Sequence, residues 1–199
     1  MAIQQEHWIS LEEYHEIERT SEVKHEYSDG RTYAMSGGTS QHSQIDGNIY
    51  LALANHLRGQ NCCPFNSDMK VLPRGDESLS YYPDITVTCN PEDYKHDSTA
   101  IRSPRLVIEV LSPSTAYRDR SEKLRAYQAW PSVEEYVMVS SRHQEIEVYH
   151  RESTDKWTFM RYTTQQNVTL ASIGLTILVS EIYANTDVPP LASVSPPTD

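Results

Sequence analysis

A run of aliphatic and β-branched residues with a carboxylate inside it constrains this fold more than any other feature. The run reads PRLVIEVL over residues 104–111, and Glu109 lies within it between Ile108 and Val110. A continuous apolar run of this length is typical of a strand that is covered on both faces of a sheet. An ionised glutamate in such a strand loses its hydration, which costs several kcal/mol unless a partner compensates it. The sequence therefore predicts a buried strand over 105–111 and a partner for Glu109.

Helix and strand patterns alternate along the rest of the chain. Ser10 and Glu13 form a capping-box pattern that predicts a short helix over 10–20, and Asp29-Gly30 predicts a hairpin turn after it. Apolar spacing predicts further helices over 41–58 and 119–130. The remaining strands are predicted over 67–72, 82–89, 134–140, 144–151, 157–163 and 168–173, with a closing element over 175–183. This order predicts an α/β fold with a mixed β-sheet flanked by helices and with an N-terminal helix and hairpin.

The length of 199 residues suits one domain that buries its own core. We expect this domain to span residues 1–185, and the proline-rich segment 186–199, which lacks periodicity, to be a flexible tail. No apolar stretch approaches the roughly 20 residues that cross a bilayer, and the first residues lack the features of a signal peptide. The expectation is a cytoplasmic protein with no membrane partner.

Three cysteines are present, Cys62, Cys63 and Cys89. An odd number with two members adjacent is a poor basis for a disulfide framework or for a zinc site. We expect reduced, buried thiols.

The charge of the chain is strongly negative overall but unevenly distributed. The net charge of −11 argues against a surface that binds nucleic acid indiscriminately. Residues 1–30 hold eight acids against two bases, whereas residues 102–125 hold six bases against three acids. Such a basic run is most often a solvated face.

Two carboxylates lie in neighbouring predicted strands, Asp84 and Glu109. If the strands are adjacent, the carboxylates converge and repel each other unless a cation lies between them. Oxygen-only ligation suits Mg²⁺. Lys123, with Tyr127 one helical turn later, could orient a water and neutralise charge on a phosphate oxygen. The competing interpretation stays open: Asp84 is a turn acid, Glu109 pairs with a buried arginine, and Lys123 is solvated.

Three short motifs together resemble a known family of nucleases. They are Tyr82-Pro83-Asp84, the segment LVIEVLSPST over 106–115, and Asp119-Arg120-x-x-Lys123. The chain is similar over about residues 8–180 to the putative restriction endonuclease family, formerly a domain of unknown function, of the PD-(D/E)xK superfamily. This resemblance implies a restriction-endonuclease-like core that hydrolyses phosphodiesters with Mg²⁺, for which Mn²⁺ can substitute.

The resemblance also implies roles for individual residues. Asp84 matches the PD aspartate and Glu109 matches the acid of (D/E)xK, so both are expected to bind the metal. The lysine position of the motif holds Leu111. Lys123 on the following helix is expected to take the role of that lysine, which makes Asp84, Glu109 and Lys123 the predicted catalytic set.

Glu26 and His42 are second-tier candidates. Glu26 could reach the metal or a phosphate, or it could be an exposed acid on an edge strand. His42 could donate to a phosphate, or it could cap its helix or fill the core. Asp119 is expected to be the N-cap of its helix.

Two functions remain open. The first is a metal-dependent DNA endonuclease that contacts DNA through segment 102–125, as a homodimer if it follows its family. The alternative is a catalytically degenerate nuclease fold that acts as a binding module, which the leucine at position 111 favours. A stabilising effect of Mg²⁺ or Mn²⁺ would separate them.

Overall fold

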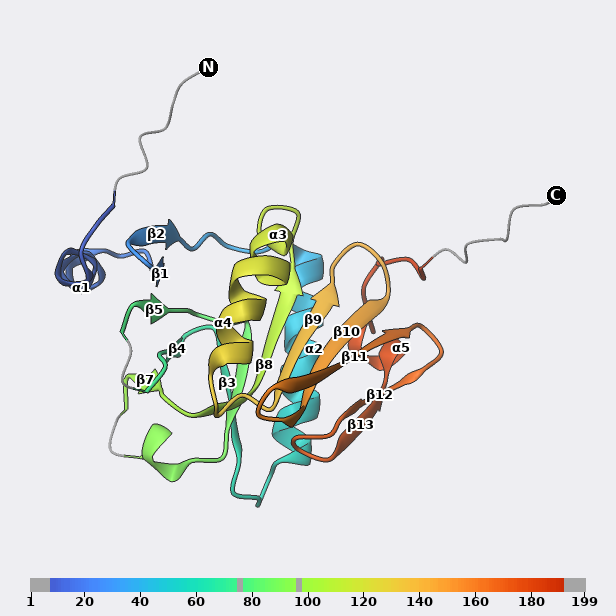
Figure 1. The fold of residues 1–199 in the computed structure, drawn as a ribbon. Coiled ribbons are helices and arrows are strands. Elements are labelled where there is room, and N and C mark those ends of the chain that lie inside the picture. The colour runs from blue at the N-terminus through green and yellow to red at the C-terminus, as the bar shows by residue number, and fades with distance from the viewer. Residues whose placement is uncertain (1–7, 75–76, 96–97, 192–199) are drawn as a thin grey trace.

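A six-stranded mixed sheet forms the centre of the molecule in the computed structural model, which describes residues 8–74, 77–95 and 98–191 (Figure 1). Its strand order is β11-β10-β9-β8-β6-β3. The strands are β3 (Cys63–Asn66), β6 (Ile85–Thr88), β8 (Pro104–Leu111), β9 (Glu135–Ser140), β10 (Glu145–Ser153) and β11 (Lys156–Thr163). The β8 and β9 strands run parallel, and all other neighbours run antiparallel. The predicted α/β class with a mixed sheet is confirmed.

The β8 strand is buried on both faces, as its sequence predicts. Leu106, Ile108 and Val110 belong to one apolar cluster, which includes residues of helix α2 (Ser40–His56). Val107 and Leu111 belong to the cluster on the opposite face, which includes residues of helix α4 (Leu124–Ala129). Figure 1 shows α2 and α4 on opposite sides of the sheet. Glu109 follows the alternation of the second face, so its side chain points toward α4.

The predicted N-terminal helix and hairpin are confirmed. Helix α1 (Leu11–Thr20) begins with the complete capping box of Ser10 and Glu13. Strands β1 (His25–Ser28) and β2 (Arg31–Ala34) pair through a turn in which Asp29 and Gly30 have positive φ angles of 45° and 87°. On its other side β1 pairs with β5 (Leu79–Ser80), which brings Glu26 close to the residues that precede β6.

The helix predicted over 119–130 is irregular. It consists of α3 (Ala116–Arg118), the π-helical turn η2 (Asp119–Lys123) and α4. A π turn shifts the phase of the side chains that follow it and often lies at a functional site. Both ends of η2, Asp119 and Lys123, are buried. Among the described residues, no helix is long and apolar enough to cross a membrane.

Short strands account for most differences from the predicted elements. The strand expected over 67–72 is reduced to β4 (Lys70–Val71), which pairs with β7 (Ala100–Ile101). The sequence patterns missed β3, β5 and β7, which are too short to show alternation. The C-terminal part contains the hairpin of β12 (Asn167–Leu170) and β13 (Leu175–Leu178), followed by α5 (Val179–Ile182), and the short 3₁₀ turn η1 spans Pro91–Asp93.

The predicted flexible tail is wrong for its first residues. Val188 is buried in the core. The Gln144 backbone N–H donates to the Pro189 carbonyl at 2.8 Å, and its side-chain amide donates to the Val188 carbonyl at 2.9 Å. These contacts anchor the chain beside the start of β10. The end of the predicted tail, residues 192–199, lies outside the described residues.

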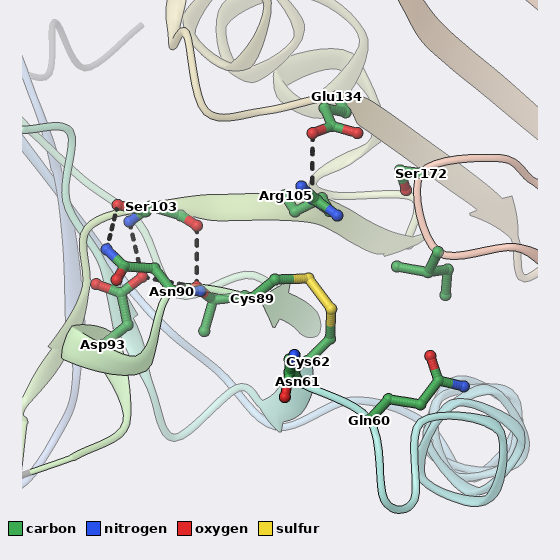
Figure 2. The surroundings of a disulfide bond; sticks show 12 residues. Gln60, Asn61, Cys62, Cys89, Asn90, Asp93, Ser103, Arg105, Glu134 and Ser172 are labelled. Atoms are coloured by element: carbon green, nitrogen blue, oxygen red, sulfur yellow. Dashed lines mark hydrogen bonds and ion pairs between the residues drawn. A yellow bond between two sulfur atoms is a disulfide. The ribbon is translucent and has the colours of Figure 1, made fainter.

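The expectation of three reduced thiols is also wrong. Cys62 and Cys89 form a disulfide (Figure 2). Cys63 is free. The β3–β6 ladder pairs Cys63 with Thr88, so the next pair in this antiparallel register is Cys62 with Cys89, whose Cα atoms are 4.0 Å apart. Because β3 was not predicted, this pairing could not be inferred from cysteine spacing.

Candidate active site

Glu109 faces a lysine and a tyrosine from the irregular helix. The Lys123 Nζ donates to Glu109 Oε1 at 2.9 Å, and the Tyr127 hydroxyl donates to the same oxygen at 3.4 Å. Glu109 and Lys123 are each only 5% exposed. The interpretation in which Lys123 is solvated and Glu109 pairs with an arginine is therefore wrong. Lys123 supplies the partner that the apolar run requires.

Lys123 lies at the centre of three carboxylates. Its Nζ is 2.9 Å from Glu26 Oε1, 2.9 Å from Glu109 Oε1 and 3.5 Å from Asp119 Oδ1. Burial disfavours the charged ammonium, but Glu109, then Glu26 and Asp119, outweigh it and hold the pKa of Lys123 well above its ordinary value. Lys123 is therefore a permanent cation in this cluster.

Glu26 is a buried member of the same cluster, so its interpretation as an exposed edge-strand acid is wrong. It is 4% exposed, it accepts from the Tyr82 backbone N–H at 3.0 Å, and it pairs with Arg118. Burial opposes its ionisation, but Lys123 and then Arg118 outweigh the burial and lower the pKa of Glu26. Glu26 is held as a carboxylate between two cations.

The charge of Glu109 is not fully compensated. Burial raises the pKa of Glu109 well above its ordinary value, Lys123 opposes this, and the negative charges of Asp119, Asp84 and Glu26 add to it. The cluster thus contains more carboxylates than cations, and an additional cation beside Glu109 would be stabilised.

Asp84 lies directly before β6. The register of Ile85 with Ile108, continued by one residue, places Asp84 opposite Glu109, and its Oδ2 accepts from the Val110 backbone N–H at 2.7 Å. The predicted adjacency of the two strands is confirmed. The two carboxylates lie on the same side of the β6–β8 pair by this register.

His42, near the start of α2, contacts Asp84. Its Nε2 is 3.4 Å from Asp84 Oδ2, and this hydrogen-bonding contact raises the pKa of His42. The N-cap of α2 is Thr39, whose hydroxyl accepts from the His42 backbone N–H at 3.3 Å. The interpretation of His42 as a helix-capping side chain is therefore wrong, because its imidazole is directed to Asp84.

Sequence analysis missed the roles of three further residues. Asp119 is not an N-cap, because the helix begins before it and its carboxylate lies beside Lys123. Arg118 joins the cluster through Glu26. Asp46, one turn after His42 on α2, has a buried Oδ1 with no hydrogen-bond partner among the described residues, and burial, together with the charge of Asp84, raises its pKa to about 6. Asp46 follows His42 by four residues in a predicted helix, and this spacing, which places both side chains on one helix face, could have indicated Asp46 from the sequence.

The oxygen atoms of Asp84 and Glu109 suit a hard divalent cation. The described hydrogen bonds of Glu109 all involve Oε1, which leaves Oε2 available as a ligand. No group of three or more His, Cys, Asp or Glu side chains with metal-ligating geometry occurs within residues 8–74, 77–95 and 98–191. Mg²⁺ commonly uses one or two carboxylates and completes its shell with water and substrate phosphate. The residues present therefore fit Mg²⁺ and lack the protein ligands of a closed structural site.

Most cations of the basic segment 102–125 are neutralised within the protein. Five of its six bases pair with carboxylates, at Glu77, Glu134, Glu26, Glu147 and Glu109. The pair of Arg105 with Glu134 is visible in Figure 2. The excess positive charge of this segment in the sequence therefore does not by itself create a positive surface.

One solved structure that resembles this fold is described as a putative nuclease. It is a putative nuclease belonging to DUF820 from Anabaena variabilis, with a TM-score of 0.71 and 16% identity, covering 88% of this chain and 97% of that one. The likeness agrees with the restriction-endonuclease-like α/β fold expected from the sequence.

Two sequence relatives and one family model match most of the chain. An uncharacterized Synechocystis protein, slr1290, is 41% identical over 175 residues, which cover 88% of this chain and 91% of the relative. A second one, sll1609, is 26% identical over 150 residues, 75% of this chain and 84% of the relative. The family model described as "Putative restriction endonuclease" matches residues 11–180. The chain therefore belongs to this family, Uma2.

Proposed function

We propose that the protein is a metal-dependent phosphodiesterase that cleaves DNA internally. The observation that carries the proposal is the convergence of Asp84, Glu109 and Lys123, since Asp84 is opposite Glu109 in register and Lys123 is 2.9 Å from Glu109. Membership of a restriction endonuclease family supports a nuclease-type function.

Asp84 and Glu109 would hold the cation, with Mg²⁺ as the physiological ion and Mn²⁺ as its substitute. When bound, such an ion polarises a phosphoryl oxygen and lowers the pKa of a water molecule. Asp84 is oriented for this role by the Val110 N–H, and Glu109 by Lys123 and Tyr127.

Lys123 would act as a cation and hydrogen-bond donor. Its raised pKa keeps it protonated, so it is unsuited to remove a proton from water. It can instead stabilise negative charge that develops on a phosphate oxygen. Leu111, at the usual lysine position, is buried in the apolar cluster beside α4. Lys123 reaches Glu109 from the irregular helix that covers the same cluster. Its ammonium can therefore take the role of the lysine that the motif has at position 111.

His42 would serve the opposite side of the scissile phosphate. Asp84 favours its protonated form, and an imidazolium can donate to a phosphate oxygen. Glu26 and Asp119 would hold Lys123 in place without touching the substrate.

A cleavage assay tests the proposal. Supercoiled plasmid and branched DNA are incubated with Mg²⁺ or Mn²⁺ and the wild-type protein, Asp84→Asn or Glu109→Gln. We expect metal-dependent nicks with the wild-type protein and a loss of at least about a hundredfold in both variants. Cleavage that survives both substitutions would place the reaction elsewhere or identify a contaminating nuclease.

The binding-module alternative has one supporting observation. Lys123 already pairs with Glu109 at 2.9 Å, so the protein itself supplies a cation to this carboxylate. This function would be favoured if the wild-type protein binds DNA, does not cleave it with any metal, and shows no change of melting temperature when Mg²⁺ or Mn²⁺ is added.

For the nuclease, a homodimer would supply one site for each strand of a duplex, and light scattering measures whether the protein forms one.

A further inference from the structure

A pocket of about 250 Å³ lies beyond the carboxyl ends of β8 and β9. Leu111 and Ser112 line it from the end of β8, Arg142 and His143 from the turn between β9 and β10, and Arg120 from η2. Leu111 follows Glu109 by two residues and belongs to the same face of the sheet. At about 3.3 Å per strand residue, the pocket begins roughly 7 Å from Glu109 along the strand.

The charges around the pocket are in positive excess. Arg120 donates twice to Glu147, at 3.2 and 3.1 Å, and Arg161 contacts Glu145 at 2.8 Å and Glu147 at 3.8 Å. Arg142 has no ion-pair partner among the described residues. Three arginines therefore face two glutamates, in a protein whose net charge is −11. His143, whose Nε2 is 2.7 Å from Glu145, adds a further positive charge when it is protonated.

The donors of the pocket suit phosphate oxygens. A guanidinium carries five N–H donors, and Arg120 uses two of them for Glu147, so donors remain. Ser112 lines the pocket, and its hydroxyl contacts those of Ser114 at 2.9 Å and Thr115 at 3.0 Å. Arginine forks and hydroxyls are the groups that most often bind the nucleic-acid backbone.

We propose that this pocket binds a backbone phosphate of the nucleic acid, next to the scissile phosphate at Glu109. The inference rests on the proposed nuclease function and identifies the surface that holds its substrate. Arg142 supplies the uncompensated charge, Arg120 is oriented by Glu147, and Ser112 provides a neutral donor. The pocket thereby provides local positive potential that the paired cations of segment 102–125 do not.

The test compares Arg142→Ala with Arg58→Ala. Arg58 follows the carboxyl end of α2 and precedes β3, whose first residue Cys63 pairs with Thr88 at the far end of β6, so Arg58 lies away from the pocket. Binding of a fluorescent DNA duplex is measured by anisotropy in EDTA between 50 and 200 mM salt, roughly the range over which phosphate contacts lose affinity. We expect Arg142→Ala to weaken the Kd about fivefold to tenfold, and to reduce the slope of log K against log salt by about 0.9, one phosphate contact. We expect Arg58→Ala to match the wild type and Arg142→Lys to restore part of the affinity.

The outcomes separate this inference from the proposed function. Equal affinity and salt slope in Arg142→Ala and Arg58→Ala, with cleavage by the wild-type protein intact, would overturn the pocket and leave the nuclease in place. Arg142-dependent binding without cleavage would support the pocket and count against the nuclease. A wild-type protein that does not bind DNA would overturn both.

Discussion

The charge balance of the candidate site depends on Lys123. One ammonium contacts Glu26, Glu109 and Asp119, and it is as buried as the carboxylates that it holds. Removing one partner from a buried ion cluster is more damaging than removing an exposed charge, because the remaining charges stay desolvated. The same residue would therefore affect both stability and catalysis.

Replacing Lys123 by methionine separates these two effects. We expect Lys123→Met to lower the free energy of unfolding at pH 7 by about 3 kcal/mol, because three buried carboxylates lose their cation. Urea unfolding measures this, and the loss should shrink at pH 5 as the carboxylates gain protons. Cleavage by the folded variant should fall by roughly a hundredfold or more. The control is Lys156→Met, which removes a 69% exposed lysine paired with Glu152 and should cost less than about 0.5 kcal/mol. If the Lys123→Met variant cleaves DNA at the wild-type rate, Lys123 takes no part in the reaction.

Asp46 predicts a pH dependence of stability. Its pKa in the folded protein is about 6, above its ordinary value of 3.8. Folding therefore favours the protonated form, so this contribution to stability is complete below pH 4 and is lost as the pH rises through 6. In EDTA, Asp46→Asn should be more stable than the wild type at pH 8 by about 1 kcal/mol, after allowance for solvent screening, and similar at pH 4. The surface variant Asp155→Asn should show no such difference. An equal gain at both pH values would assign the effect to packing.

At the scale of elements, the irregular helix and the β3–β6 ladder bring distant residues together. The π turn η2 directs both Asp119 and Lys123 inward, toward the face of β8 that carries Glu109. The β3–β6 ladder places Cys62 beside Cys89, although 27 residues separate them. The disulfide secures the edge of the sheet at the end opposite to the candidate site.

The disulfide predicts a measurable loss of stability on reduction. Closing a loop of this size stabilises a fold by about 2 to 4 kcal/mol in chain-entropy models. The Cys62→Ser variant should therefore unfold at lower urea concentration, and dithiothreitol should lower the wild-type midpoint to a similar value. Cys63→Ser keeps the disulfide and should remain sensitive to dithiothreitol. In denaturant without reductant, the wild-type protein should expose one reactive thiol, and three reactive thiols would show that the bond is absent.

At the scale of the whole molecule, the excess of carboxylates at the sheet centre couples metal binding to folding. Glu26, Asp84, Glu109 and Asp119 share one region with Lys123 and Arg118 as the cations beside them. A divalent ion that binds Asp84 and Glu109 in the folded state alone would stabilise the entire domain.

Mg²⁺ should therefore raise the melting temperature. At a hundredfold excess over the Kd the gain is about 2.7 kcal/mol, and about 2 to 4 °C per kcal/mol gives a shift of at least about 5 °C. Asp84→Asn and Glu109→Gln should lose the shift. Glu12→Gln, which removes an acid from the exposed surface of α1, should keep it. The same shift in all four proteins would mean that the ion binds elsewhere.

Local patterns in the sequence were sufficient for several elements. The Ser10–Glu13 capping box, the Asp29-Gly30 turn and the apolar run of β8 each depend on residues that are neighbours in the chain. Each pattern specifies a cap, a turn or a covered strand through local hydrogen bonds or side-chain periodicity. The family motifs likewise predicted one site from Asp84, Glu109 and Lys123; in the fold Asp84 lies opposite Glu109 in register and Lys123 pairs with Glu109.

Contacts between distant segments were decided only by the tertiary structure. Glu26 joins Lys123 across 97 residues of sequence, Cys62 meets Cys89 through an unpredicted strand, and Val188 returns to the core beside β10. The sequence by itself determined most of the longer strands and helices, since periodicity and turn chemistry are local, but not the short strands β3, β5 and β7. Strand neighbours, the phase of the π turn and the partners of each buried charge follow from burying one common core, because that free energy depends on all segments together.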